Sequence, residues 1–150
     1  RVDDAVHAVK AALDEGIVPG GGVTLIELAE SLKANSSDKH AIERTLLANA
    51  LYEPFIQLME NAGENGQAKL LLLLDKRKKS GEGIDVNNPK AIIDVKSKGI
   101  IDPARVTKEA IQNAVSIAGT ALTMGALIVD VPEPKTASAA APDMSGMMGM

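Results

Sequence analysis

The segment GIVPGGG at residues 16–22 constrains the fold most, because it places four glycines and a proline between two amphipathic stretches. In residues 2–15 the apolar side chains recur every three or four positions, which predicts a helix with one apolar face. Gly16 follows the last periodic residue, where a glycine commonly ends a helix. Helical spacing resumes at residues 25–32, so the sequence predicts two helices joined by a turn that has few side chains.

The rest of the chain is predicted to be mainly helical with one small β element. A third helix is expected to start at Ser37 or Asp38, and Pro54 either kinks it or begins a new helix. A further helix is expected over residues 66–78. Short β-branched runs bounded by Gly, Asn and Pro then predict a small hairpin or irregular sheet within residues 80–86 and 91–103.

Asp102 and Pro103 predict the start of a long helix over residues 103–126, with the carboxylate as N-cap and the proline at the first helical position. One side of this helix is dense in small residues, so another helix could approach it closely. Residues 126–132 predict a short strand. From residue 134 onward the sequence is low in complexity and predicts a disordered tail.

Composition argues against several classes of function. Only 1% of the 150 residues are aromatic, so we expect no platform for stacking bases or sugars. The net charge of −4 argues against a nucleic-acid partner, and the basic run at residues 76–79 is interpreted as a solvated helix end. His7 and His40 are too far apart to suggest a metal site.

The cellular setting is predicted from cysteine content and hydropathy. The chain has no cysteine, which is compatible with a reducing cytosol. Its longest apolar run, at residues 70–74, is far shorter than the roughly 20 residues that span a bilayer. We therefore expect a soluble, cytoplasmic protein with no membrane partner. Because the chain begins with Arg1 inside a helical pattern, we expect it to be a piece of a longer one.

The residue pattern alone leaves the candidate site residues ambiguous. The glycine triplet precedes a helix, where backbone amides can approach an anion or a flat ligand, but such a run is more often a tight turn or a close helix contact. Asp102 can cap its helix with one carboxylate oxygen and meet a ligand hydroxyl with the other. Asp4 is by default a favourable charge in an N-terminal turn, and Asp85 an ordinary turn residue.

Three motifs together resemble the chaperonin family. The stretch AALDEGIVPGGG is similar to the family's signature, and RVDDAVHAVK before it and GIIDPARVTKEAIQNAVSIAGTAL after it follow the family's order and rough spacing. The ending MSGMMGM is similar to the Gly-Met tails of the GroEL-type, group I branch. The resemblance covers essentially the whole chain. It implies the last helix of an intermediate domain (residues 1–15), the second half of an equatorial ATPase domain (16–133) and a disordered Gly/Met tail (134–150).

The resemblance implies a subunit of a double-ring machine that encloses unfolded client proteins, works with a co-chaperonin lid, and cycles by hydrolysing ATP with Mg²⁺. Asp4 matches the aspartate that orients the water attacking the γ-phosphate, a positioning role suited to a carboxylate. Gly21 matches a glycine that lies against the nucleotide, Asp102 the carboxylate that meets the ribose hydroxyls, and Ile100 a residue close to the adenine. Residues 126–131 are implied to join a sheet with the neighbouring subunit, with an edge pairing inside the chain as the alternative.

The chain departs from the GroEL-type pattern in the segment that contacts the base. Asp85 and Val86 fall in that segment, which usually reads Asn-Ala-Ala, whereas GIDVNN here is more similar to the thermosome-like, group II branch. The tail and the first ten residues favour group I.

The family's phosphate loop and its Mg²⁺-binding aspartate have no counterpart in these residues, so this piece alone is expected to be inactive as an ATPase. The alternative is a non-catalytic oligomerisation or interaction module that keeps the chaperonin fold.

Overall fold

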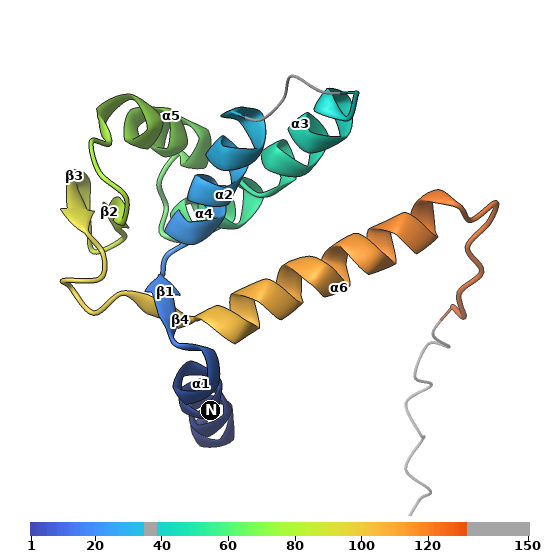
Figure 1. Cartoon of the computed structure of the whole chain (residues 1–150), viewed down its shortest axis with the longest axis horizontal. Helices are drawn as coiled ribbons and strands as arrows, with labels where there is room; N and C mark the ends of the chain where they lie inside the picture. The colour runs from blue at the N-terminus through green and yellow to red at the C-terminus, as the bar shows by residue number, and fades with distance from the viewer. Residues whose placement is uncertain (35–38, 132–150) are drawn as a thin grey trace, which may run out of the picture.

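The computed structural model describes residues 1–34 and 39–131, which form six helices and four short strands (Figure 1). The strands form two antiparallel sheets of two strands each, β1 with β4 and β2 with β3. The expected mainly helical fold with a small β element is confirmed. The elements are α1 (Val2–Glu15), β1 (Ile17–Pro19), α2 (Val23–Ala34), α3 (Ala41–Ala50), α4 (Glu53–Asn61), α5 (Gly66–Lys76), β2 (Glu82–Asp85), β3 (Asn88–Asp94), β4 (Ile101–Pro103) and α6 (Ala104–Leu122).

The hydrophobic core lies between α2, α3, α4, α5 and the β2–β3 hairpin. Phe55 on α4 is completely buried there, beside Ile26 of α2 and Leu73 of α5. Helices α4 and α5 approach closely because Gly66 has no side chain, and a Cβ at that position would overlap the carbonyl group of Ile56. Asn65 fixes the start of α5, since its side chain accepts a hydrogen bond from the amide of Ala68 at 2.9 Å.

The predicted helices are present, with differences at their ends. Pro54 lies in the first turn of α4, so it begins a new helix rather than kinking α3. Helix α3 starts at Ala41, and the predicted capping residues Ser37 and Asp38 lie outside the described residues. Helix α6 ends at Leu122, four residues before the predicted end.

The predicted hairpin or irregular sheet is divided between two separate sheets. Strands β2 and β3 form a hairpin with a register shift between Ile84 and Asp85. The segment Ile101–Pro103 instead pairs with Ile17–Pro19, which lies in the stretch predicted to be a turn between two helices. A three-residue strand is too short to show the alternation that identifies strands, which explains why β1 was missed.

The predicted N-cap role of Asp102 is wrong. Asp102 lies within β4 opposite Val18, and Pro103 occupies the N-cap position of α6 without a side-chain cap bond. Strand pairing keeps the backbone extended through Pro103, which has φ −66° and ψ 128°, so the helix starts one residue later than predicted. The carboxylate of Asp102 is therefore not used to cap a helix.

The strand predicted at residues 126–132 is also not observed in the described part of that segment, residues 126–131. A strand requires a hydrogen-bonding partner, and none of the described segments pairs with it. Its apolar side chains are exposed, with Ile128 93% and Val131 85% accessible.

Helices α1 and α6 lie outside the core and contain no fully buried residue. They meet near β4, and α6 extends away from this junction as the long orange helix in Figure 1. Ile111 is the α6 residue that packs against the core. The end of α1 is tied to the start of α6 by ion pairs, Asp14 with Arg105 at 3.2 Å and Glu15 with Lys108 at 2.6 Å.

Candidate functional site

The glycine triplet forms the turn between β1 and α2, and two of its members are explained by close packing. The amide of Gly20 donates to the carbonyl of Ile100 at 3.0 Å, and a Cβ on Gly20 would lie 3.0 Å from backbone atoms of Ile101. A Cβ on Gly22 would lie 3.0 Å from the Cβ of Phe55. The tight-turn and close-contact interpretation therefore accounts for Gly20 and Gly22.

Gly21 is different, because a side chain there would meet little of the protein. Its φ of +64° favours glycine, but a Cβ would contact only Cγ2 of Ile100, at an ordinary 3.6 Å. The amides of Gly21 and Gly22 donate no hydrogen bond to any acceptor in the described part of the chain. Two backbone donors at the start of α2 can therefore bind an anionic or polar ligand.

Asp102 places a carboxylate two residues after Ile100. It accepts no hydrogen bond and forms no ion pair with the residues that the structure describes. Although Asp102 is an exposed residue, partial desolvation of its carboxyl by neighbouring protein atoms raises the pKa of that group above its ordinary value. A partly desolvated carboxylate without a protein partner can accept hydrogen bonds from ligand hydroxyls.

The structure brings three of the predicted site residues together. Gly21 lies beside the side chain of Ile100, since a Cβ at position 21 would be 3.6 Å from Cγ2 of Ile100, and Asp102 follows Ile100 by two residues. The hydrogen bond between Gly20 and Ile100 fixes this segment against the glycine turn. The group combines backbone donors, an apolar side chain and a carboxylate acceptor.

Asp85 and Val86 lie apart from this group, at the turn of the β2–β3 hairpin. The carboxylate of Asp85 accepts hydrogen bonds from the backbone and side-chain nitrogens of Asn87, at 2.9 and 3.2 Å. Val86 is 37% exposed. Among the described residues, no hydrogen bond or ion pair joins the hairpin turn to Gly21 or Asp102.

The structure does not link Asp4 to the group either. Asp4 is exposed in the first turn of α1, and at 1.5 Å per residue it lies about 18 Å along the helix axis from Gly16. Its carboxylate has no hydrogen-bonding or ionic partner in the described ranges. Its position is set by the direction of α1, which is held at its other end by the ion pairs to α6 and by the bond from the Ala104 amide to the Gly16 carbonyl at 3.0 Å.

No group of three or more acidic, histidine or cysteine side chains suited to a metal ion occurs in residues 1–34 and 39–131. The three candidate carboxylates lie on different elements, Asp4 on α1, Asp85 in β2 and Asp102 in β4, and no described hydrogen bond joins any two of them. The residues described here thus do not by themselves form a Mg²⁺ site.

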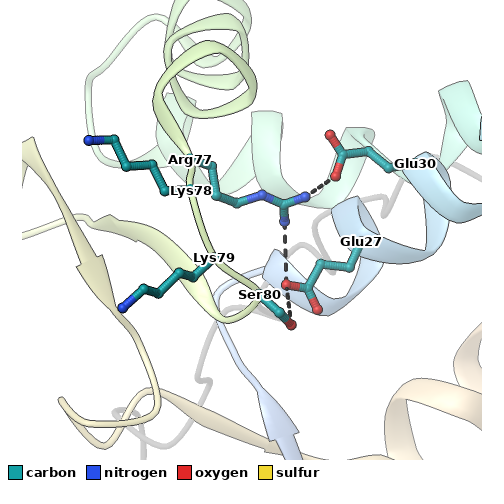
Figure 2. A pocket seen from close by; sticks show the side chains of 6 residues that line it. All are labelled: Glu27, Glu30, Arg77, Lys78, Lys79 and Ser80. Atoms are coloured by element: carbon teal, nitrogen blue, oxygen red, sulfur yellow. Dashed lines mark hydrogen bonds and ion pairs between the residues drawn. The ribbon is translucent and has the colours of Figure 1, made fainter.

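Sequence reasoning missed a second cluster, which surrounds a hollow of about 350 Å³ between α2 and the segment after α5 (Figure 2). Glu27 and Glu30 of α2 both pair with Arg77. One oxygen of Glu27, Oε1, also accepts hydrogen bonds from the Ser80 hydroxyl at 3.0 Å and the Gly81 amide at 2.7 Å. Opposite charges on α2 and in the basic run were the available signal, but nothing in the sequence showed that the two segments meet.

The interpretation of residues 76–79 as a solvated helix end needs correction at one position. The Arg77 side chain is only 13% exposed and is bound by two carboxylates. Lys78 and Lys79 are exposed, and their backbone amides donate to the carboxylate of Glu82. These bonds lower the pKa of Glu82.

These features describe a helical domain with a glycine turn, a nearby carboxylate and a small hairpin. The profile described as the TCP-1/cpn60 chaperonin family matches residues 1–132, and the chain belongs to that family.

Two solved chaperonin structures are similar to this chain. A group III chaperonin in the open state is 29% identical with a TM-score of 0.68, over 79% of this chain and 25% of that one. An open-state monomer of a group II chaperonin from Methanococcoides burtonii is 25% identical with a TM-score of 0.70, over 81% of this chain and 32% of that one. The chain thus spans about a quarter to a third of the length of the solved chaperonins it matches.

The comparisons confirm the family but do not support the group I, GroEL-type assignment. One of the two similar structures is a group III chaperonin and the other a group II chaperonin. This agrees with the GIDVNN segment, which is similar to group II, rather than with the tail, which is similar to group I. The tail, at residues 134–150, lies outside the described residues. Within the described residues, no helix combines the length and apolar content needed to cross a membrane.

Proposed function

We propose that this chain is the C-terminal part of a chaperonin subunit that binds and hydrolyses ATP, and that Gly21, Ile100 and Asp102 form one wall of its nucleotide pocket. The observation that carries the proposal is the Asp102 carboxylate, which has no partner among the described residues and lies two positions after Ile100, the residue whose carbonyl accepts from the Gly20 amide of the glycine turn. Membership of the chaperonin family supports it.

Each residue of this wall has a chemistry suited to one part of a nucleotide. The carboxylate of Asp102 accepts hydrogen bonds from the ribose hydroxyls, and the side chain of Ile100 gives the adenine an apolar contact. The amides of Gly21 and Gly22 donate hydrogen bonds to polar atoms of the ligand. The ligand can approach these amides closely because Gly21 has no side chain. Asp85 and Val86 approach the base from the hairpin.

The phosphates and Mg²⁺ would be bound by the rest of a longer subunit. Mg²⁺ neutralises charge on the phosphate oxygens during phosphoryl transfer. We assign Asp4 the role of accepting a hydrogen bond from the attacking water. Because Asp4 lies on α1, which is connected to the glycine turn through Gly16 and strand β1, a change in the direction of α1 would bring the Asp4 carboxylate to the phosphate side of the pocket.

Assembly into rings accounts for the apolar surface that this piece exposes. Leu13 of α1 and Leu122 of α6 are 81% and 83% exposed, and Ile128 is 93% exposed. We assign the helix faces to contacts with the rest of the subunit, and residues 126–131 to a sheet with a ring neighbour. Unfolded clients and a co-chaperonin lid would bind domains beyond this segment, and we expect the assembly to be cytoplasmic.

The proposal is tested by measuring ATP affinity and turnover in the intact subunit. Asp102→Ala should weaken ATP binding at least about tenfold, because each charge-assisted hydrogen bond contributes about 1.5–3 kcal/mol. Asp4→Ala should leave binding unchanged and reduce turnover by about a hundredfold or more. Asp3→Ala is the matched control, since Asp3 is the exposed neighbour of Asp4 on the same helical turn.

Unchanged binding in Asp102→Ala would overturn the assignment of the pocket wall. Equal turnover in the Asp4 and Asp3 variants would overturn the catalytic role of Asp4. A subunit that assembles into rings but neither binds nor hydrolyses ATP would instead be the non-catalytic module with a chaperonin fold.

A further inference from the structure

The glycine turn, the hairpin and the Ile100 segment are connected by a closed series of hydrogen bonds. The Gly20 amide donates to the Ile100 carbonyl at 3.0 Å, and the Ile100 amide donates to the Val95 carbonyl at 2.9 Å. The Val95 amide donates to the Gly81 carbonyl at 3.0 Å. The Gly81 amide donates to Oε1 of Glu27 at 2.7 Å, and Glu27 returns the series to Gly20 through α2.

Glu27 is the side chain that closes this series, because every other link joins backbone atoms. It is held in place by Arg77, which it shares with Glu30, and it also accepts from the Ser80 hydroxyl (Figure 2). The Glu27 side chain is 25% exposed and that of Arg77 13%, so water competes weakly for these bonds.

The closed series spans both sides of the proposed pocket. Gly20 and Ile100 lie on the side of the pocket that the glycine turn forms. Gly81 lies on the other side, where it immediately precedes β2, the strand that ends at Asp85 and is followed by Val86. Strand β2 also packs tightly on the start of α2, since a Cβ on Gly83 would overlap the side chain of Val23. Glu27 therefore fixes one end of the hairpin, at Gly81, beside the backbone hydrogen bonds and the packing of Gly83 on Val23 that also set its position relative to the glycine turn.

We propose that Glu27 is a positioning residue of the nucleotide site, which sets the hairpin and the Ile100 segment at the spacing that an adenine base requires. The inference rests on the proposed function, because it assigns a role within the same pocket. Glu27 itself contacts no ligand. Glu27 positions the base-binding residues Asp85 and Val86 through its hydrogen bond to the Gly81 amide. The part of the site that binds the phosphates does not depend on this bond.

The difference between the base-binding and the phosphate-binding sides allows a test. The intact subunit is titrated calorimetrically with ATP, which has a base, and separately with inorganic tripolyphosphate, which has none. Glu27→Met, which keeps the length of the side chain but has no acceptor, should weaken ATP binding about tenfold without changing tripolyphosphate binding. Glu27→Gln keeps an oxygen that can accept from Gly81 and should restore most of the ATP affinity. Glu30→Met is the matched control, because it removes a partner of Arg77 but no link of the series, and it should bind both ligands like the wild type.

The inference is overturned if Glu27→Met binds ATP as tightly as Glu30→Met, or if it weakens ATP and tripolyphosphate equally. If Glu27→Met does not fold, Glu27→Asp takes its place in the test. Aspartate keeps the negative charge, but its shorter side chain does not reach the Gly81 amide. A ratio of ATP affinity to tripolyphosphate affinity equal to that of the wild type would then overturn the inference. Loss of ATP binding in Asp102→Ala together with unchanged binding in the Glu27 variants would refute the role of Glu27 alone. Unchanged binding in Asp102→Ala would refute the pocket itself.

Discussion

Replacing Gly21 with alanine tests whether the glycine at this position is needed for ATP binding or only for folding of the glycine turn. Its φ of +64° makes an alanine cost about 1–2 kcal/mol, of which about 0.4–1 kcal/mol is offset by the lower entropy of the unfolded chain. No steric cost is added, because the new methyl group would lie 3.6 Å from Ile100 Cγ2. We therefore expect Gly21→Ala to fold with a free energy of unfolding lower by about 1 kcal/mol.

The same methyl group would occupy the side of the turn that faces the proposed nucleotide. Overpacking of a close contact costs about 1–3 kcal/mol, which corresponds to roughly 5- to 150-fold weaker ATP binding. Gly16→Ala is the control: Gly16 has φ 84° and ψ −166°, a conformation nearly exclusive to glycine, so alanine should cost about 2 kcal/mol of stability there. A Cβ on Gly16 meets nothing within 4 Å, so ATP binding should not change.

The assay pairs urea denaturation with calorimetric titration of ATP into the intact subunit. The expected result is an inversion, in which the more destabilising variant, Gly16→Ala, keeps its affinity and the milder one, Gly21→Ala, loses it. Affinities that follow stability in both variants would refute the reasoning, because they would show that the glycine at position 21 matters for folding alone.

Three further predictions concern stability. The Tm of Asp102→Asn should rise relative to that of the wild type as the pH increases from about 3 to 7. The pKa of the Asp102 carboxyl is raised in the folded state, so the wild-type fold loses stability as this carboxyl ionises. A difference in Tm that does not change with pH would contradict this prediction. Gly83→Ala should lower the free energy of unfolding by about 1–3 kcal/mol through overlap with Val23, and an unchanged urea midpoint would exclude that overlap. A double-mutant cycle on Lys108 and Glu15, both exposed, should give a coupling of about 0.5 kcal/mol that disappears near 1 M salt, whereas a salt-independent coupling would indicate a buried contact.

Most of the helical fold could be predicted from the sequence because its signals are local. The apolar spacing of α4 and α5, and the turn residues between them, depend on neighbours within a few positions. Strand β1 could not be predicted in this way, since its three residues are a strand only because residues 101–103 lie beside them. The same long-range pairing moved Asp102 out of the N-cap position that its local sequence predicts.

The candidate site shows the same division between local and long-range information. The glycine triplet was identifiable as a turn, but only the structure separates Gly21, which has space beside it, from Gly20 and Gly22, which pack against the protein. Gly21 and Ile100 lie side by side although they are 79 positions apart in the sequence, so no sequence periodicity could reveal their proximity. Glu27 and Arg77 were missed for this reason, because a charge pattern does not reveal which segments meet.

Hydrogen exchange of the intact subunit with and without saturating ATP tests the central claim most directly. The account predicts slower amide exchange on binding in peptides that cover Gly21 and Gly22 and in peptides that cover residues 100–104, where the proposed wall meets the ligand. The peptide around Ile42, an exposed residue of α3 outside this wall, should exchange at the same rate in both states. Saturated ATP binding with no protection at the glycine turn or at residues 100–104 would contradict the account.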